Sequence, residues 1–193
     1  MSSNVTYTYD ESRKEGERIT SVWVNGKPID PKGTYSVGSG SFLIAGRDNF
    51  TELAKGSKPV DSGRISLSAW VDWIKAHKTL KPDFAKRAVS LTTSLHEGTS
   101  RDTTFTLGKP ADKAVAPDTV DFTSKDAVVN TIMKAQIVQD DKTVDVATTP
   151  VKDGWSSVSV KVPTAKGLVS GEATTVFTFP DSGTTVRFAA KLS

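Results

Sequence analysis

Short runs of alternating β-forming residues recur from about residue 102 to the end of the chain, and turn residues separate them. The runs are 104–107, 132–138, 144–146, 158–162, 175–179 and 185–188, with turn signals at 153–154 and 181–183. Such alternation places one set of side chains in a core and the other in solvent. Residues 128–139 could also be a helix, but their β-branched side chains favour a strand. We therefore expect an all-β, immunoglobulin-like sandwich over residues 102–193.

The first 78 residues combine strand and helix signals, which predict an α+β part with a mixed sheet and helices. Strands are expected at 5–9, 19–24 and 35–37, and a hairpin turn at 25–26. Apolar residues at i, i+3, i+4 and i+7 predict a helix over 66–77 with Ser66 as its N-cap, and a shorter helix is expected to start near Asp48.

Three segments follow from these patterns. We expect residues 1–79 to form the first, residues 80–101 to act as a connector, and residues 102–193 to form the β-rich module. Within the connector, residues 82–87 are expected to make one helical turn, and residues 89–91 a strand.

Composition excludes several classes of protein. The 193 residues carry a net charge of +3, and the basic residues are scattered rather than gathered with aromatic ones, so nucleic acid is not an expected partner. No apolar run approaches the roughly 20 residues of a membrane span. The chain has no cysteine, which excludes disulfides, thiolate metal sites and a Cys nucleophile. Residues 1–4 show no signal-peptide pattern.

Catalytic motifs are also missing. The chain has two histidines, His77 and His96, and neither belongs to a spaced metal-binding motif. Residues 38–41 (GSGS) only approximate a nucleophile elbow, and the glycines fit neither a dinucleotide-binding nor a P-loop pattern. The adjacent pair Asp140 and Asp141 is expected to point to opposite sides of the chain, which does not suit acid–base work. We therefore predict no catalytic residue and no metal ligand in this chain.

Residues 41–50 (SFLIAGRDNF) are the strongest candidate for a binding site. They are expected to run from a strand end through a glycine turn into a helix, and they carry Phe42, Asp48 and Phe50. Taken from spacing alone, the ordinary interpretation is two core rings and a helix cap. The functional alternative is an aromatic platform beside a hydrogen-bond acceptor. Stacking a base on such a ring contributes roughly 1–3 kcal/mol, and a carboxylate accepts hydrogen bonds from sugar hydroxyls.

Several motifs in the same order resemble the C-terminal domain of the 5'-nucleotidase family. They are SRKEGER at 12–18, VWVNGKPID at 22–30, YSVGSGSFLIAGRDNF at 35–50 and DSGRI at 61–65. The similarity is close to continuous over residues 7–78, which shifts the balance toward the functional interpretation of Phe42 and Asp48.

The resemblance implies a two-domain metallophosphoesterase-type hydrolase. In that family an N-terminal domain holds two divalent ions of the zinc or manganese type, and the C-terminal domain binds the nucleoside. By resemblance, Phe42 stacks on the base, Asp48 binds the ribose hydroxyls and Gly46 forms the turn. Phe50 lines the substrate or the core. Arg47 stands where a second glycine is usual, so that its side chain crowds the pocket or reaches the ligand.

The resemblance further implies that the metallophosphoesterase domain and the first half of the nucleoside-binding domain lie outside this chain. We then expect a fragment that binds a nucleoside or nucleotide but is inactive by itself. Its parent would be an extracellular or bacterial cell-surface enzyme of nucleotide catabolism, with residues 102–193 as a spacer that contacts the cell wall. The alternative is a structural or adhesive surface module without a ligand.

Overall fold

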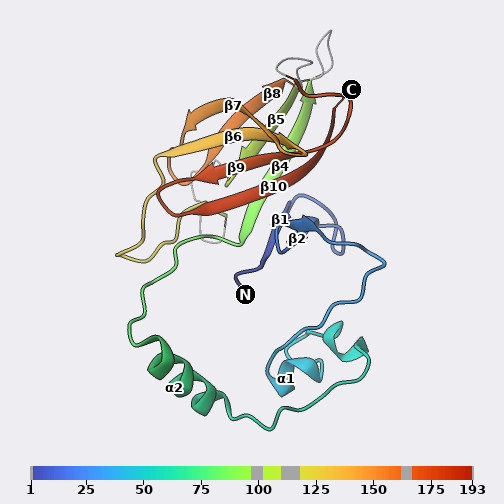
Figure 1. Ribbon diagram of the computed structural model, residues 1–193, viewed down its shortest axis with the longest axis vertical. Helices are drawn as coiled ribbons and strands as arrows, with labels where there is room; N and C mark the ends of the chain where they lie inside the picture. The colour runs from blue at the N-terminus through green and yellow to red at the C-terminus, as the bar shows by residue number, and fades with distance from the viewer. Residues whose placement is uncertain (1, 97–101, 110–117, 162–166, 193) are drawn as a thin grey trace. The chain divides into compact units, whose positions relative to one another are not determined.

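The computed structural model describes residues 2–96, 102–109, 118–161 and 167–192 (Figure 1). In chain order the elements are β1 Val5–Tyr9, β2 Ile19–Val24, β3 Lys27–Pro28, α1 Ser41–Ile44, the 3-10 helix η1 Leu53–Lys55, α2 Ser66–His77, β4 Ala88–His96, β5 Asp102–Leu107, β6 Ile132–Gln139, β7 Lys142–Pro150, β8 Ser156–Lys161, β9 Gly171–Phe179 and β10 Thr184–Leu192. They form two compact units, which are described separately. One unit comprises residues 1–30 and 83–193, and the other comprises residues 31–82.

The larger unit consists of two β-sheets. One has six strands in the order β3-β2-β1-β4-β5-β8, and the other has four in the order β10-β9-β6-β7. The described strands are thus mostly antiparallel, with one parallel pair between β1 and β4. The predicted strands at 5–9, 19–24, 104–107, 132–138, 144–146, 175–179 and 185–188 are confirmed, and most of them are longer than predicted. The run predicted at 158–162 is confirmed as far as Lys161, and residue 162 lies outside the described residues.

Strand β4 joins the N-terminal strands to the β-rich module. Its first residues pair with β1 in parallel, and from Leu91 onward it pairs antiparallel with β5. The segment expected to be a connector therefore contains a nine-residue strand, of which the sequence predicted three residues.

The helical turn expected at 82–87 is absent. Two backbone amides there bind side chains instead, since the amide of Ala85 donates to the Asp83 carboxylate at 3.0 Å and the amide of Lys86 donates to the Thr184 hydroxyl at 2.8 Å. The amide of Tyr7 donates to the carbonyl of Arg87 at 2.8 Å.

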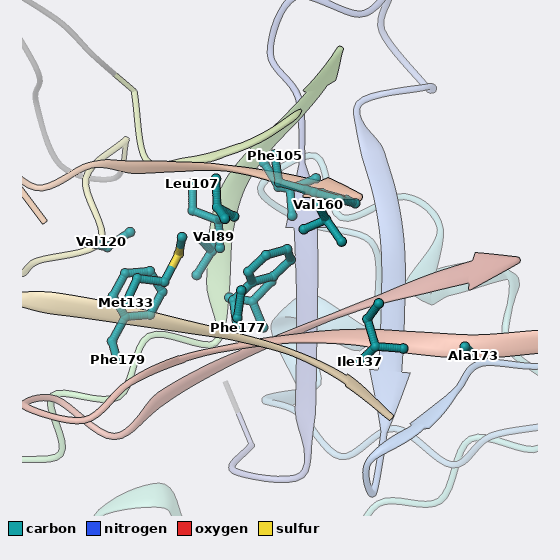
Figure 2. Packing of buried hydrophobic residues seen from close by; sticks show 14 of the residues in the cluster. Val89, Phe105, Leu107, Val120, Met133, Ile137, Val160, Ala173, Phe177 and Phe179 are labelled. Atoms are coloured by element: carbon teal, nitrogen blue, oxygen red, sulfur yellow. The ribbon is translucent and has the colours of Figure 1, made fainter. Parts of the chain in front are cut away.

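The core lies between the two sheets. Alternate residues of β6 and β9 are buried, as the sequence pattern predicted. The rings of Phe105 on β5 and Phe177 on β9 lie 5.1 Å apart between centroids (Figure 2). Strands of both sheets supply most of the buried cluster: Val89, Leu91, Phe105, Leu107, Met133, Ala135, Ile137, Val158, Val160, Ala173, Phe177, Phe179, Val186 and Leu192. Val120 and Leu168 join the cluster from segments outside the strands. The sandwich layering is therefore observed, whereas an immunoglobulin-like topology stays a prediction.

Residues 128–131 precede the strand rather than belonging to it, because side chains there bind the backbone. The Asn130 backbone amide donates to the Asp121 carboxylate at 3.0 Å, and the Thr131 backbone amide donates to the Asp181 carboxylate at 2.7 Å. Each of these bonds satisfies a backbone N–H that would otherwise need a partner in a strand ladder.

Two predictions for the smaller unit are wrong. Residues 35–37 form no strand, and no helix starts at Asp48. Asp48 and Asn49 have φ values of 52° and 63°, and a residue in this left-handed region cannot continue a right-handed helix. The short helix α1 lies earlier, before Gly46.

The helix predicted over 66–77 is confirmed as α2, but its N-cap is wrong. Ile65 occupies the cap position without a side-chain hydrogen bond, and Ser66 is the first helical residue. Among the described residues, no helix has both the length and the apolar character needed to cross a membrane.

Candidate functional site

The candidate binding segment is a compact loop, residues 41–50, that begins with the short helix α1 and ends before η1. The amide of Arg47 donates to the carbonyl of Phe42 at 3.3 Å, and the amide of Phe50 donates to the carbonyl of Arg47 at 3.2 Å. These two bonds fold residues 42–50 back on themselves. The loop therefore has a defined backbone although it holds only one short helical turn at each end.

Gly46 permits this turn for two reasons. Its φ of +79° lies in the left-handed region, where a side chain adds strain. A Cβ at this position would also lie 3.1 Å from the Cβ of Ala54, which is tighter than ordinary contact. The absence of a side chain at Gly46 thus lets residue 46 approach Ala54.

The side chains of the predicted site residues face solvent. Phe42 is 57% exposed and Phe50 is 51% exposed, and Arg47 and Asp48 are exposed as well. Burial in a core, the ordinary interpretation of the two rings, does not occur within the described residues. Asp48 also caps no helix. The structure thus brings the five residues onto one loop with both rings accessible.

Helix α2 carries an aromatic row that the sequence analysis did not single out as such. The Trp73 ring stacks on the His77 ring at 4.1 Å between centroids, and the Trp70 ring meets Trp73 edge-on at 6.3 Å. The His77 Nδ1 lies 2.8 Å from the Trp73 carbonyl oxygen. The spacing of 70, 73 and 77 along a helix would have indicated this row.

A polar cluster lies in the larger unit around the buried side chain of Lys86. Its Nζ donates to the carbonyl of Thr119 at 2.5 Å and lies 5.3 Å from the centre of the Phe122 ring. Burial lowers the pKa of Lys86, and the nearby carboxylates of Asp121 and Asp118 oppose that shift. These contacts tie the segment before β4 to residues 119–122, so we assign the cluster a structural role.

Tyr9 on β1 lies near the same carboxylates. Burial, and then the charges of Asp118 and Glu11, raise the pKa of Tyr9 to about 12. Within the described part of the chain, no group of three or more His, Cys, Asp or Glu side chains is arranged to hold a metal ion.

Comparison with known proteins identifies the N-terminal segment. Residues 1–55 match the family model described as 5'-nucleotidase, C-terminal domain. A 5'-nucleotidase-related protein of Glossina morsitans morsitans is 34% identical over 88 residues, which are 42% of this chain and 16% of the relative. An apyrase of Tabanus yao is 30% identical over 81 residues, which are 38% of this chain and 15% of the relative.

The class indicated for this segment is therefore a C-terminal domain of the 5'-nucleotidase type. More specifically, the match over residues 1–55 confirms the resemblance to the C-terminal domain of the 5'-nucleotidase family that the sequence motifs indicated. The matched region spans only 15–16% of the length of these two relatives.

Proposed function

We propose that the loop around Phe42 and Asp48 forms part of the nucleoside-binding surface of an extracellular, 5'-nucleotidase-like hydrolase that dephosphorylates nucleotides. The observation that carries this proposal is that the family match over residues 1–55 contains the whole loop. The exposure of Phe42 and of Asp48 on a hydrogen-bonded backbone supports it, because a ligand could reach both side chains.

The proposed roles follow the chemistry of each side chain. Phe42 offers a ring face to the base, and such stacking contributes roughly 1–3 kcal/mol. The Asp48 carboxylate accepts hydrogen bonds from the ribose hydroxyls. Gly46 holds the turn that presents both. Arg47 adds a cation that can approach a phosphate, and Phe50 forms the far side of the loop.

We assign the hydrolysis of the phosphate ester to a domain other than the one described here. In our proposal, a metallophosphoesterase domain outside this chain holds two divalent ions of the zinc or manganese type. Those ions would supply a metal-activated hydroxide for attack on phosphorus. The chain described here would bind and orient the nucleoside, and residues 102–193 would act as a spacer at the cell surface. Purified alone, the chain should not hydrolyse AMP in the presence of added Mn²⁺ or Zn²⁺.

Residue-resolved NMR titration with adenosine and AMP tests the binding role. We expect shifts centred on residues 42–50, at affinities as weak as millimolar, and their loss in Phe42→Ala. Val129→Ala is the control, since Val129 is 69% exposed and lies outside the loop. Shifts that persist in Phe42→Ala, or that centre on the larger unit, would contradict the proposal.

A second candidate is a structural or adhesive module, and one feature of the larger unit favours it. The outer face of β5 and β8 carries registered hydroxyls, with Thr104 and Ser159 joined at 2.7 Å and Thr106 and Ser157 at 3.2 Å. Such an uncharged hydroxyl array could contact a cell-wall polymer. Co-sedimentation of the full chain with isolated bacterial cell wall, weakened by Thr106→Glu, would support this candidate. Equal recovery of both proteins would count against it.

A further inference from the structure

Two buried side chains in the larger unit have complementary chemistry. Lys86, shortly before β4, is 8% exposed, and Asn130, shortly before β6, is 2% exposed. A buried lysine is rare in proteins, because its ammonium group loses the water that solvates it. Lys86 brings an amine, which is a nucleophile when neutral, and Asn130 brings a carboxamide, which has an acyl carbon that a nucleophile can attack. The pair therefore holds both reactants of an amide exchange.

The short segment at residues 119–120 binds both side chains. The Nζ of Lys86 donates to the carbonyl of Thr119 at 2.5 Å, and the Nδ2 of Asn130 donates to the carbonyl of Val120 at 3.3 Å. The two nitrogens are thus bound to the carbonyls of consecutive residues. These bonds bring the amine and the carboxamide to the same stretch of backbone.

The turn between β9 and β10 binds the same two residues. The backbone amide of Lys86 donates to the hydroxyl of Thr184 at 2.8 Å, and the backbone amide of Ser182 donates to the Oδ1 of Asn130 at 3.2 Å. The hydroxyls of Ser182 and Thr184 are themselves 2.8 Å apart. Contacts with two separate segments therefore converge on Lys86 and Asn130, and the fold itself brings them to one site.

Asp121 links the amine to the carboxamide. Its Oδ1 accepts from the Nδ2 of Asn130 at 2.7 Å and from the Asn130 backbone amide at 3.0 Å. Burial lowers the pKa of Lys86, against the opposing charges of Asp121 and then Asp118, and a lowered pKa favours the neutral, nucleophilic amine. A carboxyl group that acts on both nitrogens can carry a proton from one to the other.

The surroundings suit attack on the Asn130 carbonyl. The Ser182 N–H already donates to Oδ1, the atom on which negative charge develops when a nucleophile adds to the carbonyl carbon. The rings of Phe84 and Phe122 meet edge-on at 6.2 Å, and the Nζ of Lys86 lies 5.3 Å from the centre of the Phe122 ring. These rings provide an apolar side to the site, where hydrogen bonds are stronger than in water.

We propose that Lys86 and Asn130 form an intramolecular isopeptide bond, with Asp121 as the proton carrier. The Nζ of Lys86 attacks the Cγ of Asn130, so that the Nζ–Cγ bond forms and the Cγ–Nδ2 bond breaks. One proton passes from Nζ through the Asp121 carboxyl group to Nδ2, and ammonia leaves. The reaction needs no oxidant, reductant or cofactor, because one amide replaces another.

The bond would tie together the two sheets of the sandwich. Lys86 leads into β4 of the six-stranded sheet, and Asn130 leads into β6 of the four-stranded sheet. The chain has no cysteine, so a disulfide cannot supply such a link. A covalent link stabilises a fold mainly by restricting the unfolded chain. This role goes beyond the proposed function, since it is independent of nucleoside binding at Phe42.

The mass of the purified full chain, measured after denaturation, tests the bond. We expect a mass lower by one ammonia than that calculated for the same N-terminus, and a branched proteolytic peptide that contains residues 86 and 130. The calculated mass without any loss would overturn the proposal. So would an ammonia loss located at Asn25, which precedes Gly26 and can cyclise. Loss of one water in place of ammonia would show that a carboxyl group reacted instead of Asn130.

Variants of the two reactants make the test specific. Lys86→Arg keeps the positive charge but removes the amine, and Asn130→Ala removes the acyl group, so each variant should have its full calculated mass. Lys109→Arg is the matched control, because Lys109 lies 3.8 Å from Asp118 but is half exposed, and it should still lose ammonia. Far-UV circular dichroism checks that each variant folds, and Lys86→Met replaces Lys86→Arg if the latter does not. Ammonia loss that persists in a folded Lys86 variant would overturn the proposal.

The role of Asp121 has its own readout. Asp121→Asn should leave most of the chain without the bond, since general acid–base catalysis contributes roughly 100-fold or more to a rate. A folded Asp121→Asn chain that is linked as completely as the unmodified chain would overturn the role of Asp121 as proton carrier.

Discussion

Gly108, directly after β5, offers the sharpest test of the sandwich. Its φ is +73°, and a Cβ built there would lie 2.4 Å from the carbonyl oxygen of Gly154 and 3.0 Å from the Cα of Trp155. Both contacts are with backbone, which cannot rotate away as a side chain would. Gly108→Ala should therefore force the end of β5 away from the turn at residues 153–155.

A matched control separates the two costs of this substitution. Gly183, in the turn between β9 and β10, has nearly the same φ of +75°, but a Cβ there meets nothing within 4 Å. Gly183→Ala should cost only the left-handed conformation, about 1–2 kcal/mol. Gly108→Ala should cost that amount plus the steric overlap, which at about 1–3 kcal/mol resembles overpacking in a core.

Urea unfolding, followed by tryptophan fluorescence, measures how much each variant lowers the free energy of unfolding relative to the unmodified chain. We expect Gly108→Ala to lower the free energy of unfolding more than Gly183→Ala does, with an unchanged dependence on urea. Equal losses would mean that β5 and the 153–155 turn do not approach each other as described. That result would refute the argument from close backbone contact.

Three further predictions concern the larger unit. Phe177→Ala removes a fully buried ring of β9 and should lower the free energy of unfolding in urea by about 3–5 kcal/mol, since the cavity cannot collapse fully. A loss below about 1 kcal/mol would contradict the described core. Hydrogen bonds from the Thr131 backbone amide and hydroxyl lower the pKa of Asp181. The ionised Asp181 carboxylate therefore stabilises the fold above pH 3.8, the pKa of the unfolded chain, and this stabilisation is lost as the pH falls through the lower pKa of the folded protein. Asp181→Asn should therefore reduce the melting temperature at neutral pH and lose that difference in acid, and a difference that grows in acid would refute this. Burial, and then the charge of Asp118, raises the pKa of Tyr9 from 10.0 to about 12. The neutral Tyr9 side chain therefore contributes fully to stability below pH 10, and this contribution is lost as the pH rises toward 12. Melting curves should show wild type losing more stability than Tyr9→Phe over that interval, and parallel losses would exclude Tyr9 as the cause.

The sandwich strands could be predicted because one face of each is buried. Strand β9, for example, alternates buried and partly buried residues along its length, and that pattern is legible without knowing its neighbours. The extent of β4 could not be predicted in the same way. Its first residues pair with β1, about 80 positions earlier in the chain, and its later residues pair with β5. When pairing with neighbours on both sides sets the length of a strand, the sequence of the strand itself gives little indication of where the strand begins and ends.

The local structure of the smaller unit was harder to predict, because none of its residues is buried and packing therefore does not fix its strands and helices. Residues 35–37 alternate like a strand, yet the described residues include no neighbour for them to pair with. The backbone at Asp48 depends on a left-handed turn that Asp and Asn tolerate but do not require. The α2 helix could be predicted because its apolar period is intrinsic to the segment, whereas its N-cap could not.

The family match crosses the boundary between the two units, and this has a consequence for the candidate site. Residues 1–30 belong to the sandwich unit, where β1 is joined to β4, whereas residues 31–55, including Phe42, belong to the unit without buried residues. Since the Phe42 ring is 57% exposed and belongs to no buried cluster among the described residues, its removal should leave the urea midpoint unchanged. Ligand binding and global stability are therefore separable at this residue. A loss of nucleoside-induced shifts in Phe42→Ala can then be attributed to the missing ring and not to unfolding of the chain.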